Sequence, residues 1–226
     1  MKRHKVFSSI AKKQIVAVTG LALIGFIIAH LAGNLFIYGG PDVFNAYAEE
    51  LAHFRPALYV VEYALLAVFI IHIWVTALLV LENIKARGGL RRYAVDKPVG
   101  NRSLATRLMP YSGTYILLFV LWHLLDFTFI DHDGPRSYIA GKSYGLYGVV
   151  VNSFADPAHS FLYIVAMCFL GLHLAHGAQS CAQTFGFNHP KYTPAIKKFS
   201  RYFAVLIVIA YSSIPLYVLF IMGTRT

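Results

Sequence analysis

The sequence predicts an all-α integral membrane protein, a bundle of five transmembrane helices that forms one domain over residues 1–226. Two observations predict this fold class. Hydrophobic residues make up 58% of the chain and charged residues only 13%, about half the share found in soluble domains. Five apolar runs are also long enough to cross a hydrocarbon core of ~30 Å at ~1.5 Å per residue. Lipid can solvate the outer faces of such a chain.

The five runs are expected to form helices over 14–38, 57–84, 108–130, 158–182 and 202–222. None of them alternates strictly between apolar and polar residues, as a strand of a membrane barrel would. The first run is too long for the apolar part of a cleavable signal peptide, so we expect it to remain as a helix. Pro215 lies inside the fifth run and predicts a kink there.

The charged residues predict the orientation. Of the 20 Lys and Arg residues, five precede the first run, seven lie over 85–107 and four over 187–201. Six of the 10 acidic residues lie in the alternate loops, 39–56 and 131–157. By the positive-inside rule, the N-terminus is expected in the cytoplasm and the C-terminus outside. The two outer loops are rich in Gly, Pro, Asn, Tyr and Asp, and we expect them to form an ordered lid.

Charge and cysteine usage argue against two other classes of protein. The net charge of +10 could indicate a nucleic-acid partner. The basic residues lie in short loops between apolar runs, however, so no such partner is expected. Cys168 and Cys181 lie in or at the end of an apolar run, and the chain has no CxxCH motif. We therefore expect neither a covalently attached haem nor a disulfide framework.

Four of the ten histidines lie inside apolar runs, one in each of the first four: His30, His72, His123 and His173. A single intramembrane histidine is explained equally well by a hydrogen bond to a neighbouring helix. Polar side chains are nevertheless costly in a bilayer and are usually functional. Four histidines in four successive helices therefore favour a shared role.

The depths of these histidines sort them into two pairs. His30 and His123 lie about 15 residues from the cytoplasmic ends of their runs, or ~22 Å from the inner face. His72 and His173 lie at the same distance from the outer ends of antiparallel runs, hence ~14 Å closer to the inner face. Two facing neutral imidazoles suit a haem iron, and a helical bundle can hold such cofactors in its core. The sequence thus predicts an outer and an inner haem site.

Two alternatives remain open from the residues alone. Small residues surround His30 and His173, and they could either admit a flat porphyrin or serve close helix packing. His173 and His176 lie three residues apart on one helix, so they could bind a metal ion together, and His176 is the rival of His173 as a haem ligand. Four ligands in two layers do not fit one zinc ion.

Short motifs follow one another along nearly the whole chain up to the fifth run: Thr19-Gly20, His30-Leu-Ala-Gly-Asn34, Phe44-Asn45-Ala-Tyr47, Ile71-His72, Leu121-Trp-His123 and His173-Leu-Ala-His-Gly-Ala-Gln-Ser180. They resemble the type B cytochrome b subunit of succinate dehydrogenases and fumarate reductases. Members of that family are single polypeptides with five helices and two b haems.

The resemblance implies the same pairing of ligands. His72 and His173 are expected to bind the proximal haem, near the cytoplasmic subunits, and His30 and His123 the distal haem. His173 is preferred over His176 because the family ligand is followed four residues later by glycine, here Gly177. Some members carry a glutamate, linked to transmembrane proton transfer, where this chain has Gly171, so that proton path is not expected here.

The resemblance also implies a function as the membrane anchor and electron-transfer subunit of a succinate:quinone oxidoreductase in the cytoplasmic membrane of a prokaryote. A flavoprotein and an iron–sulfur subunit are expected on the cytoplasmic face, with the basic segments 85–107 and 187–201 as docking surfaces. The expected quinone is menaquinone. The chain by itself is not expected to oxidise succinate, because it has no flavin fingerprint and no cysteine cluster.

Reduction of a quinone consumes protons, so hydrogen-bonding or protonatable groups are expected near one haem. The candidates on the outer side are Glu62, Glu49, Glu50, His53 and Arg55, with Asp126 and His159 near the same level. Glu62 lies inside an apolar run, where a carboxylate without a partner is costly. The alternative is that Glu62 only pairs with Arg55.

Two other functions are compatible with intramembrane histidines. The chain could be the cytochrome b subunit of another respiratory complex, such as a hydrogenase or a formate dehydrogenase. It could instead be a small transporter whose histidines form a proton or metal path, in which case the purified protein would be colourless. Only the haem interpretations account for two matched pairs at two depths.

Overall fold

The computed structural model describes residues 8–86 and 104–222. The basic residues before Ser8, and those between residues 87 and 103, lie outside the described residues. The described part is almost entirely helical, and its only strands form a short antiparallel hairpin, β1 (Tyr138–Ile139) with β2 (Lys142–Ser143). The predicted all-α fold class is therefore confirmed for the part of the chain that the structure describes.

Five helical segments are long and apolar enough to cross a membrane, as predicted: Ser9–Gly39, Arg55–Ala86, Ala105–Phe127, Pro157–Thr184 and Thr193–Ile221. They correspond to α1 (Ser9–Asn34) with the 3₁₀ turn η1 (Leu35–Gly39), α3 (Arg55–Ala86), α4 (Leu104–Phe127), α6 (Pro157–Thr184), and α7 (Thr193–Tyr217) with the π-helical η3 (Val218–Met222). The chain is thus built as a multi-pass membrane protein.

The fifth helix differs most from its predicted bounds, because α7 begins at Thr193 rather than at residue 202. Its first turns carry Lys197, Lys198 and Arg201. Only the part of a helix that lies in the hydrocarbon core must be apolar. Polar turns that continue the same helix into water therefore lie outside the apolar run. Pro215 lies inside α7, and the helix continues past it into the π-helical turns of η3.

Side-chain caps mark the starts of two membrane helices. The Ser8 hydroxyl accepts a hydrogen bond from the Ala11 amide at 3.1 Å and caps α1. The Asp156 carboxylate accepts from the Ala158 amide at 2.9 Å and caps α6, with Pro157 in its first turn. Both caps satisfy amide groups that a helix start leaves without a partner.

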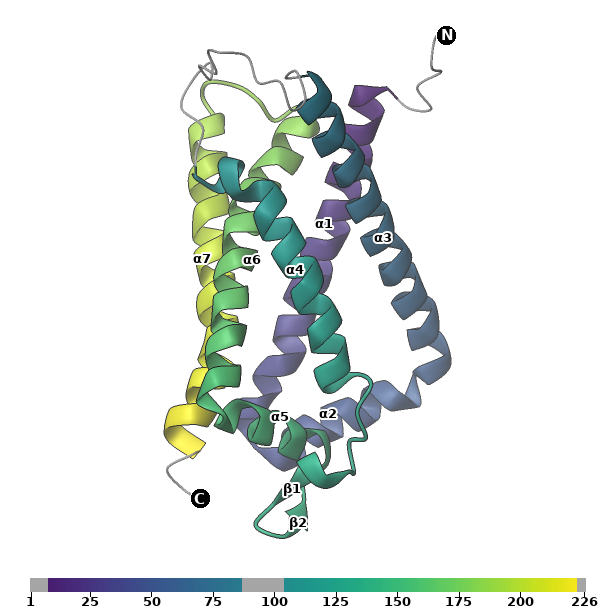
Figure 1. Ribbon diagram of the computed structural model, residues 1–226, viewed down its shortest axis with the longest axis vertical. Coiled ribbons are helices and arrows are strands. Elements are labelled where there is room, and N and C mark those ends of the chain that lie inside the picture. The colour runs from purple at the N-terminus through teal and green to yellow at the C-terminus, as the bar shows by residue number, and fades with distance from the viewer. Residues whose placement is uncertain (1–7, 87–103, 223–226) are drawn as a thin grey trace.

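The long helices run along the long axis of the molecule, and α6 packs against α7, α4 and α1, while α3 packs mainly on α1 (Figure 1). One end of the bundle holds the start of α4, the end of α6 and the start of α7. The opposite end holds the two short helices α2 (Pro41–His53) and α5 (Gly145–Ala155), which lie across the bundle. The start of α1 lies at the first of these ends, and the end of α7 lies at the end with α2 and α5.

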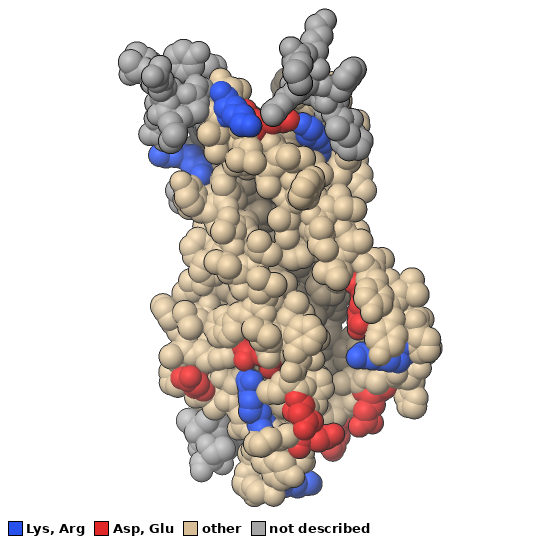
Figure 2. Space-filling model, turned by 45° about the vertical axis from the view of Figure 1, so that its right-hand side comes forward, with Lys and Arg blue, Asp and Glu red and all other residues tan. Residues whose placement is uncertain are grey.

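The charges on the surface match this shape. On the face drawn in Figure 2, Lys, Arg, Asp and Glu side chains gather toward the two ends, and a broad belt between them carries none. Near the start of α1, the buried Lys12 side chain forms an ion pair with Glu82 near the end of α3. This ion pair connects α1 and α3 at the ends of their apolar stretches.

The two segments expected to form a lid contain the short helices α2 and α5. Asn45 on α2 joins them, because its side chain donates to the Tyr144 carbonyl at 2.8 Å and accepts from the Tyr147 amide at 3.1 Å. A core of buried apolar residues, which includes Phe44 of α2 and Val150 of α5, fills this end of the bundle. The lid is therefore part of the folded core.

A glycine in α5 allows the lid to close on itself. A Cβ atom at Gly148 would overlap the backbone carbonyl of Ser137 in η2 (Pro135–Ser137), which cannot move as a flexible side chain could. We expect Gly148→Ala to destabilise the lid by up to about 3 kcal/mol and to expose 128–144 to limited proteolysis. Gly25→Ala is the control, since its Cβ would meet nothing within 4 Å. Equal proteolysis of both variants would contradict this account.

Candidate functional site

The four membrane histidines meet in the two predicted pairs. The ring centroids of His30 on α1 and His123 on α4 lie 5.9 Å apart, with the ring planes at 85°. Those of His72 on α3 and His173 on α6 lie 6.5 Å apart, with the planes at 66°. Each pair therefore joins two different helices across the interior of the bundle.

These distances fit ligation of one iron by two imidazoles. Metal–imidazole bonds of about 2 Å on opposite sides of one ion place the two ring centroids roughly 6 Å apart. The centroid distances of 5.9 Å and 6.5 Å lie on either side of that value. The spacing of both pairs is thus compatible with a six-coordinate haem.

Hydroxyl groups contact one nitrogen of each ring in the pair of His72 and His173, which is called the inner pair after its predicted position. The Thr19 Oγ1 atom lies 3.0 Å from Nδ1 of His72, and the Ser112 Oγ atom lies 3.3 Å from Nδ1 of His173. Each hydroxyl donates its own proton to a helix carbonyl, that of Ile15 or that of Met109. With the hydroxyl proton given to the carbonyl, each hydroxyl accepts from Nδ1–H, and the tautomer that makes this contact keeps a lone pair on Nε2.

A hydroxyl also contacts His123 in the pair that it forms with His30, called the outer pair after its predicted position. The Tyr163 hydroxyl donates to Asp126 at 2.8 Å, and it lies 3.4 Å from Nδ1 of His123, where its oxygen is placed to accept from Nδ1–H. Three of the four imidazoles thus have a hydroxyl beside Nδ1, a contact that suits the tautomer that would bind a metal through Nε2. The fourth, His30, stacks on Phe26 at 5.3 Å and lies beside Tyr211 at 6.3 Å, measured between ring centroids.

Two glycines give the inner pair its space. A Cβ atom at Gly20 would lie 3.3 Å from Cε1 of His72, and one at Gly113 would lie 3.4 Å from Cε1 of His173. Each glycine precedes a histidine of the outer pair by ten residues on the same helix. Ten residues span ~15 Å of α-helix, so both helices separate the pairs by nearly the predicted ~14 Å along the bundle.

Sequence reasoning missed most of these supporting residues, although a signal for them exists. Thr19-Gly20 precedes His30, and Ser112-Gly113 precedes His123, with the same spacing in both helices. A hydroxyl residue, a glycine, nine residues and a histidine therefore recur in α1 and α4. This short repeat would have shown that each of these helices contacts both pairs.

His176 has a different partner from His173. Its Nδ1 atom lies 3.1 Å from Oγ1 of Thr106 on α4, whereas the ring contact with His72 is made by His173. Within residues 8–86 and 104–222, no three His, Cys, Asp or Glu side chains gather closely enough to hold one metal ion. The geometry thus favours His173 as the partner of His72.

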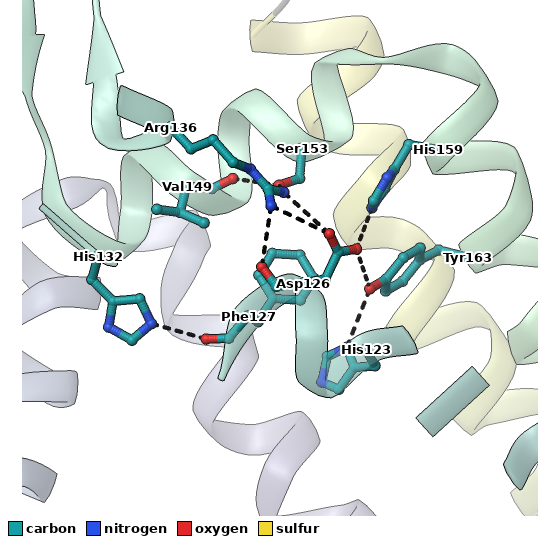
Figure 3. A network of polar contacts seen from close by, with 9 residues as sticks. All are labelled: His123, Asp126, Phe127, His132, Arg136, Val149, Ser153, His159 and Tyr163. Atoms are coloured by element: carbon teal, nitrogen blue, oxygen red, sulfur yellow. Dashed lines mark hydrogen bonds and ion pairs between the residues drawn. The ribbon is translucent and has the colours of Figure 1, made fainter. Parts of the chain in front are cut away.

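A cluster of polar side chains lies next to the outer pair, centred on Asp126 (Figure 3). Asp126 is only 8% exposed. Besides Tyr163, its carboxylate contacts Nε2 of His159 at 3.0 Å and Nη2 of Arg136 at 3.3 Å. The Arg136 guanidinium also bonds to Ser153 of α5. The cluster therefore joins α4, α5 and α6 and the turn η2 above the outer pair.

The predicted quinone candidates are placed differently. Arg55 and Glu62 form an ion pair at 3.6 Å on α3, with 54% and 53% of their side chains exposed. The alternative interpretation of Glu62, a partner for Arg55, is thus the one observed, and such exposed pairs contribute at most about 1 kcal/mol. Glu49 and His53 line an open depression on α2, and Glu50 is exposed beside them. Of the groups expected on the outer side, Asp126 and His159 are the two that belong to the cluster beside His123.

Comparison with known proteins found no match: no protein-family model, no curated protein and no solved structure. The two histidine pairs and the sequence motifs around them are therefore the features of this chain that bear on its function.

Proposed function

We propose that this chain is the dihaem cytochrome b membrane subunit of a succinate:quinone oxidoreductase. One observation carries the proposal. Two pairs of intramembrane histidines lie with their ring centroids 5.9 Å and 6.5 Å apart, and in three of the four rings a hydroxyl lies within 3.4 Å of Nδ1. The packing of membrane helices does not by itself require two facing pairs of histidines, and polar side chains are costly in a bilayer.

The residues have distinct roles in this proposal. His30 and His123 would hold the outer haem b, and His72 and His173 the inner one. The haems, when bound, supply one-electron transfer between the two ends of the bundle. Thr19, Ser112 and Tyr163 orient the rings by fixing Nδ1, and the two glycines beside the inner pair let α1 and α4 approach it closely.

The proposed orientation places the His72–His173 pair nearer the cytoplasm and the lid of α2 and α5 outside. Its support is the distribution of basic residues. The described ones at the end opposite the lid include Lys12, Lys13, Lys85 and Arg107. This end would dock the iron–sulfur and flavoprotein subunits. The proposed electron acceptor or donor in the membrane is menaquinone, and the proposed location is the cytoplasmic membrane of a prokaryote.

The test is a pyridine haemochrome assay with a reduced-minus-oxidised spectrum on the detergent-purified protein. We expect two b haems per chain. Colourless protein, after reconstitution with haem, would overturn the proposal and favour the transporter. Subunits that co-purify from the native membrane distinguish the complexes: a flavoprotein that oxidises succinate supports our assignment, and a hydrogenase or formate dehydrogenase subunit would contradict it.

A further inference from the structure

The two histidine pairs differ in what lies behind their hydroxyl partners. At the inner pair, the Thr19 and Ser112 hydroxyls donate to helix carbonyls, at 2.7 Å and 3.1 Å. At the outer pair, the Tyr163 hydroxyl donates to the carboxylate of Asp126 at 2.8 Å. The inner rings are thus held by neutral groups, and His123 is connected through one tyrosine to an acidic side chain.

The surroundings of Asp126 strengthen this connection. The carboxylate is almost fully buried, and the Arg136 guanidinium at 3.3 Å provides the opposite charge that a buried carboxylate needs. Tyr163 is itself buried, and its ring packs against those of His123 and His159. Hydrogen bonds polarise one another more strongly in such a water-poor interior than in water. The carboxylate therefore pulls on the tyrosine proton, and the tyrosine oxygen becomes a better acceptor for Nδ1–H of His123.

A ligating imidazole that donates to a stronger acceptor becomes more basic and donates more electron density to its metal. Greater donation stabilises the oxidised form of the iron. We propose that Asp126, acting through Tyr163, lowers the midpoint potential of the haem held by His30 and His123 relative to that of the other haem. Asp126 and Tyr163 are thus positioning residues that act through His123. The inference depends on the function proposed above, because it requires a bound haem at this pair.

The test is a redox titration of the purified complex, followed by the optical spectra of the two haems. Tyr163→Phe removes the connection, and Asp126→Asn removes the charge while it keeps the tyrosine. We expect each variant to favour reduction of the outer haem by about tenfold, an upward shift of about 59 mV for one electron. The inner haem should keep its potential. Asp126→Glu restores the charge and should bring the potential back toward that of the wild type.

Tyr211→Phe is the matched control. The Tyr211 ring lies 6.3 Å from that of His30, as the Tyr163 ring lies 6.0 Å from that of His123, but its hydroxyl donates to the backbone carbonyl of Ile27 at 2.7 Å. Loss of this hydroxyl should leave both potentials in place. Thr19→Val is the reciprocal variant and should change the inner haem alone.

The outcomes separate the two proposals. A wild-type protein with two haems, in which Asp126→Asn leaves the outer potential unchanged, would overturn the inference and leave the proposed function standing. An equal shift in Tyr211→Phe would overturn it as well, because any lost hydroxyl would then have the same effect. A wild-type protein that binds no haem would overturn the proposed function itself. If Tyr163→Phe loses the outer haem, Asp126→Asn decides the inference.

Discussion

Replacement of His72 or His173 by alanine is expected to reduce the haem content from two per chain to one. His72 and His173 would hold the inner haem, and a water-poor interior offers no substitute ligand when one imidazole is removed, so this haem should be lost or bound only weakly. His30→Ala and His123→Ala should remove the other haem. The measurement is haem content per chain together with the reduced-minus-oxidised spectrum, in which the two losses should affect different components.

His176→Ala is the control for this series. It removes an imidazole from the same helix, three residues after His173, and costs only a hydrogen bond to Thr106. Both haems should remain. A protein that keeps two haems without His173 and loses one without His176 would show that the ligand assignment on α6 is wrong.

Gly20→Leu and Gly113→Leu are expected to expel the inner haem while the outer haem remains. A Cβ atom at either position already lies within 3.4 Å of an imidazole carbon, so the longer leucine side chain would displace the ring of His72 or His173. An overpacked core typically loses about 1–3 kcal/mol, and the displaced ring can no longer meet its partner. Haem content and the thermal unfolding temperature in detergent measure the two consequences.

Gly25→Leu separates this effect from a general intolerance to bulk in α1. Gly25 lies on the same helix, it is exposed, and a Cβ atom there would meet nothing within 4 Å. In a membrane its side chain would face lipid, where leucine is favourable. This variant should keep two haems. If Gly20→Leu and Gly113→Leu kept two haems as well, the close approach of α1 and α4 to the inner pair would have no functional importance.

The membrane helices were predictable because hydropathy alone determines them. A helix in lipid must satisfy its own backbone and needs a run of apolar residues of a certain length, and both requirements are visible in the sequence. The pairing of His30 with His123 and of His72 with His173 was predictable for a related reason. The rise per residue of a helix is constant, so residue numbers in antiparallel spans convert directly into depth.

The end of the bundle that carries α2 and α5 was much less predictable. The loops 39–56 and 131–157 were expected to be ordered, but their helices depend on contacts distant in sequence, such as the bonds from Asn45 to the start of α5. The sequence allows two interpretations of Glu62, because residue spacing alone does not identify the partner of its carboxylate. Arg55 proved to be that partner, and the cluster around Asp126 takes its residues from three helices and a turn.

The sequence by itself thus determined the five apolar spans, the all-α membrane class and the sorting of the four histidines into two pairs, because hydropathy and helical rise are local properties of the chain. Only the tertiary structure decided which side chains support the rings. The hydroxyls of Thr19, Ser112 and Tyr163 contact Nδ1 atoms on other helices. Asp126 of α4 contacts Arg136 of the turn η2 and His159 of α6. These contacts depend on the rotation and approach of packed helices, which residue spacing along one helix does not specify.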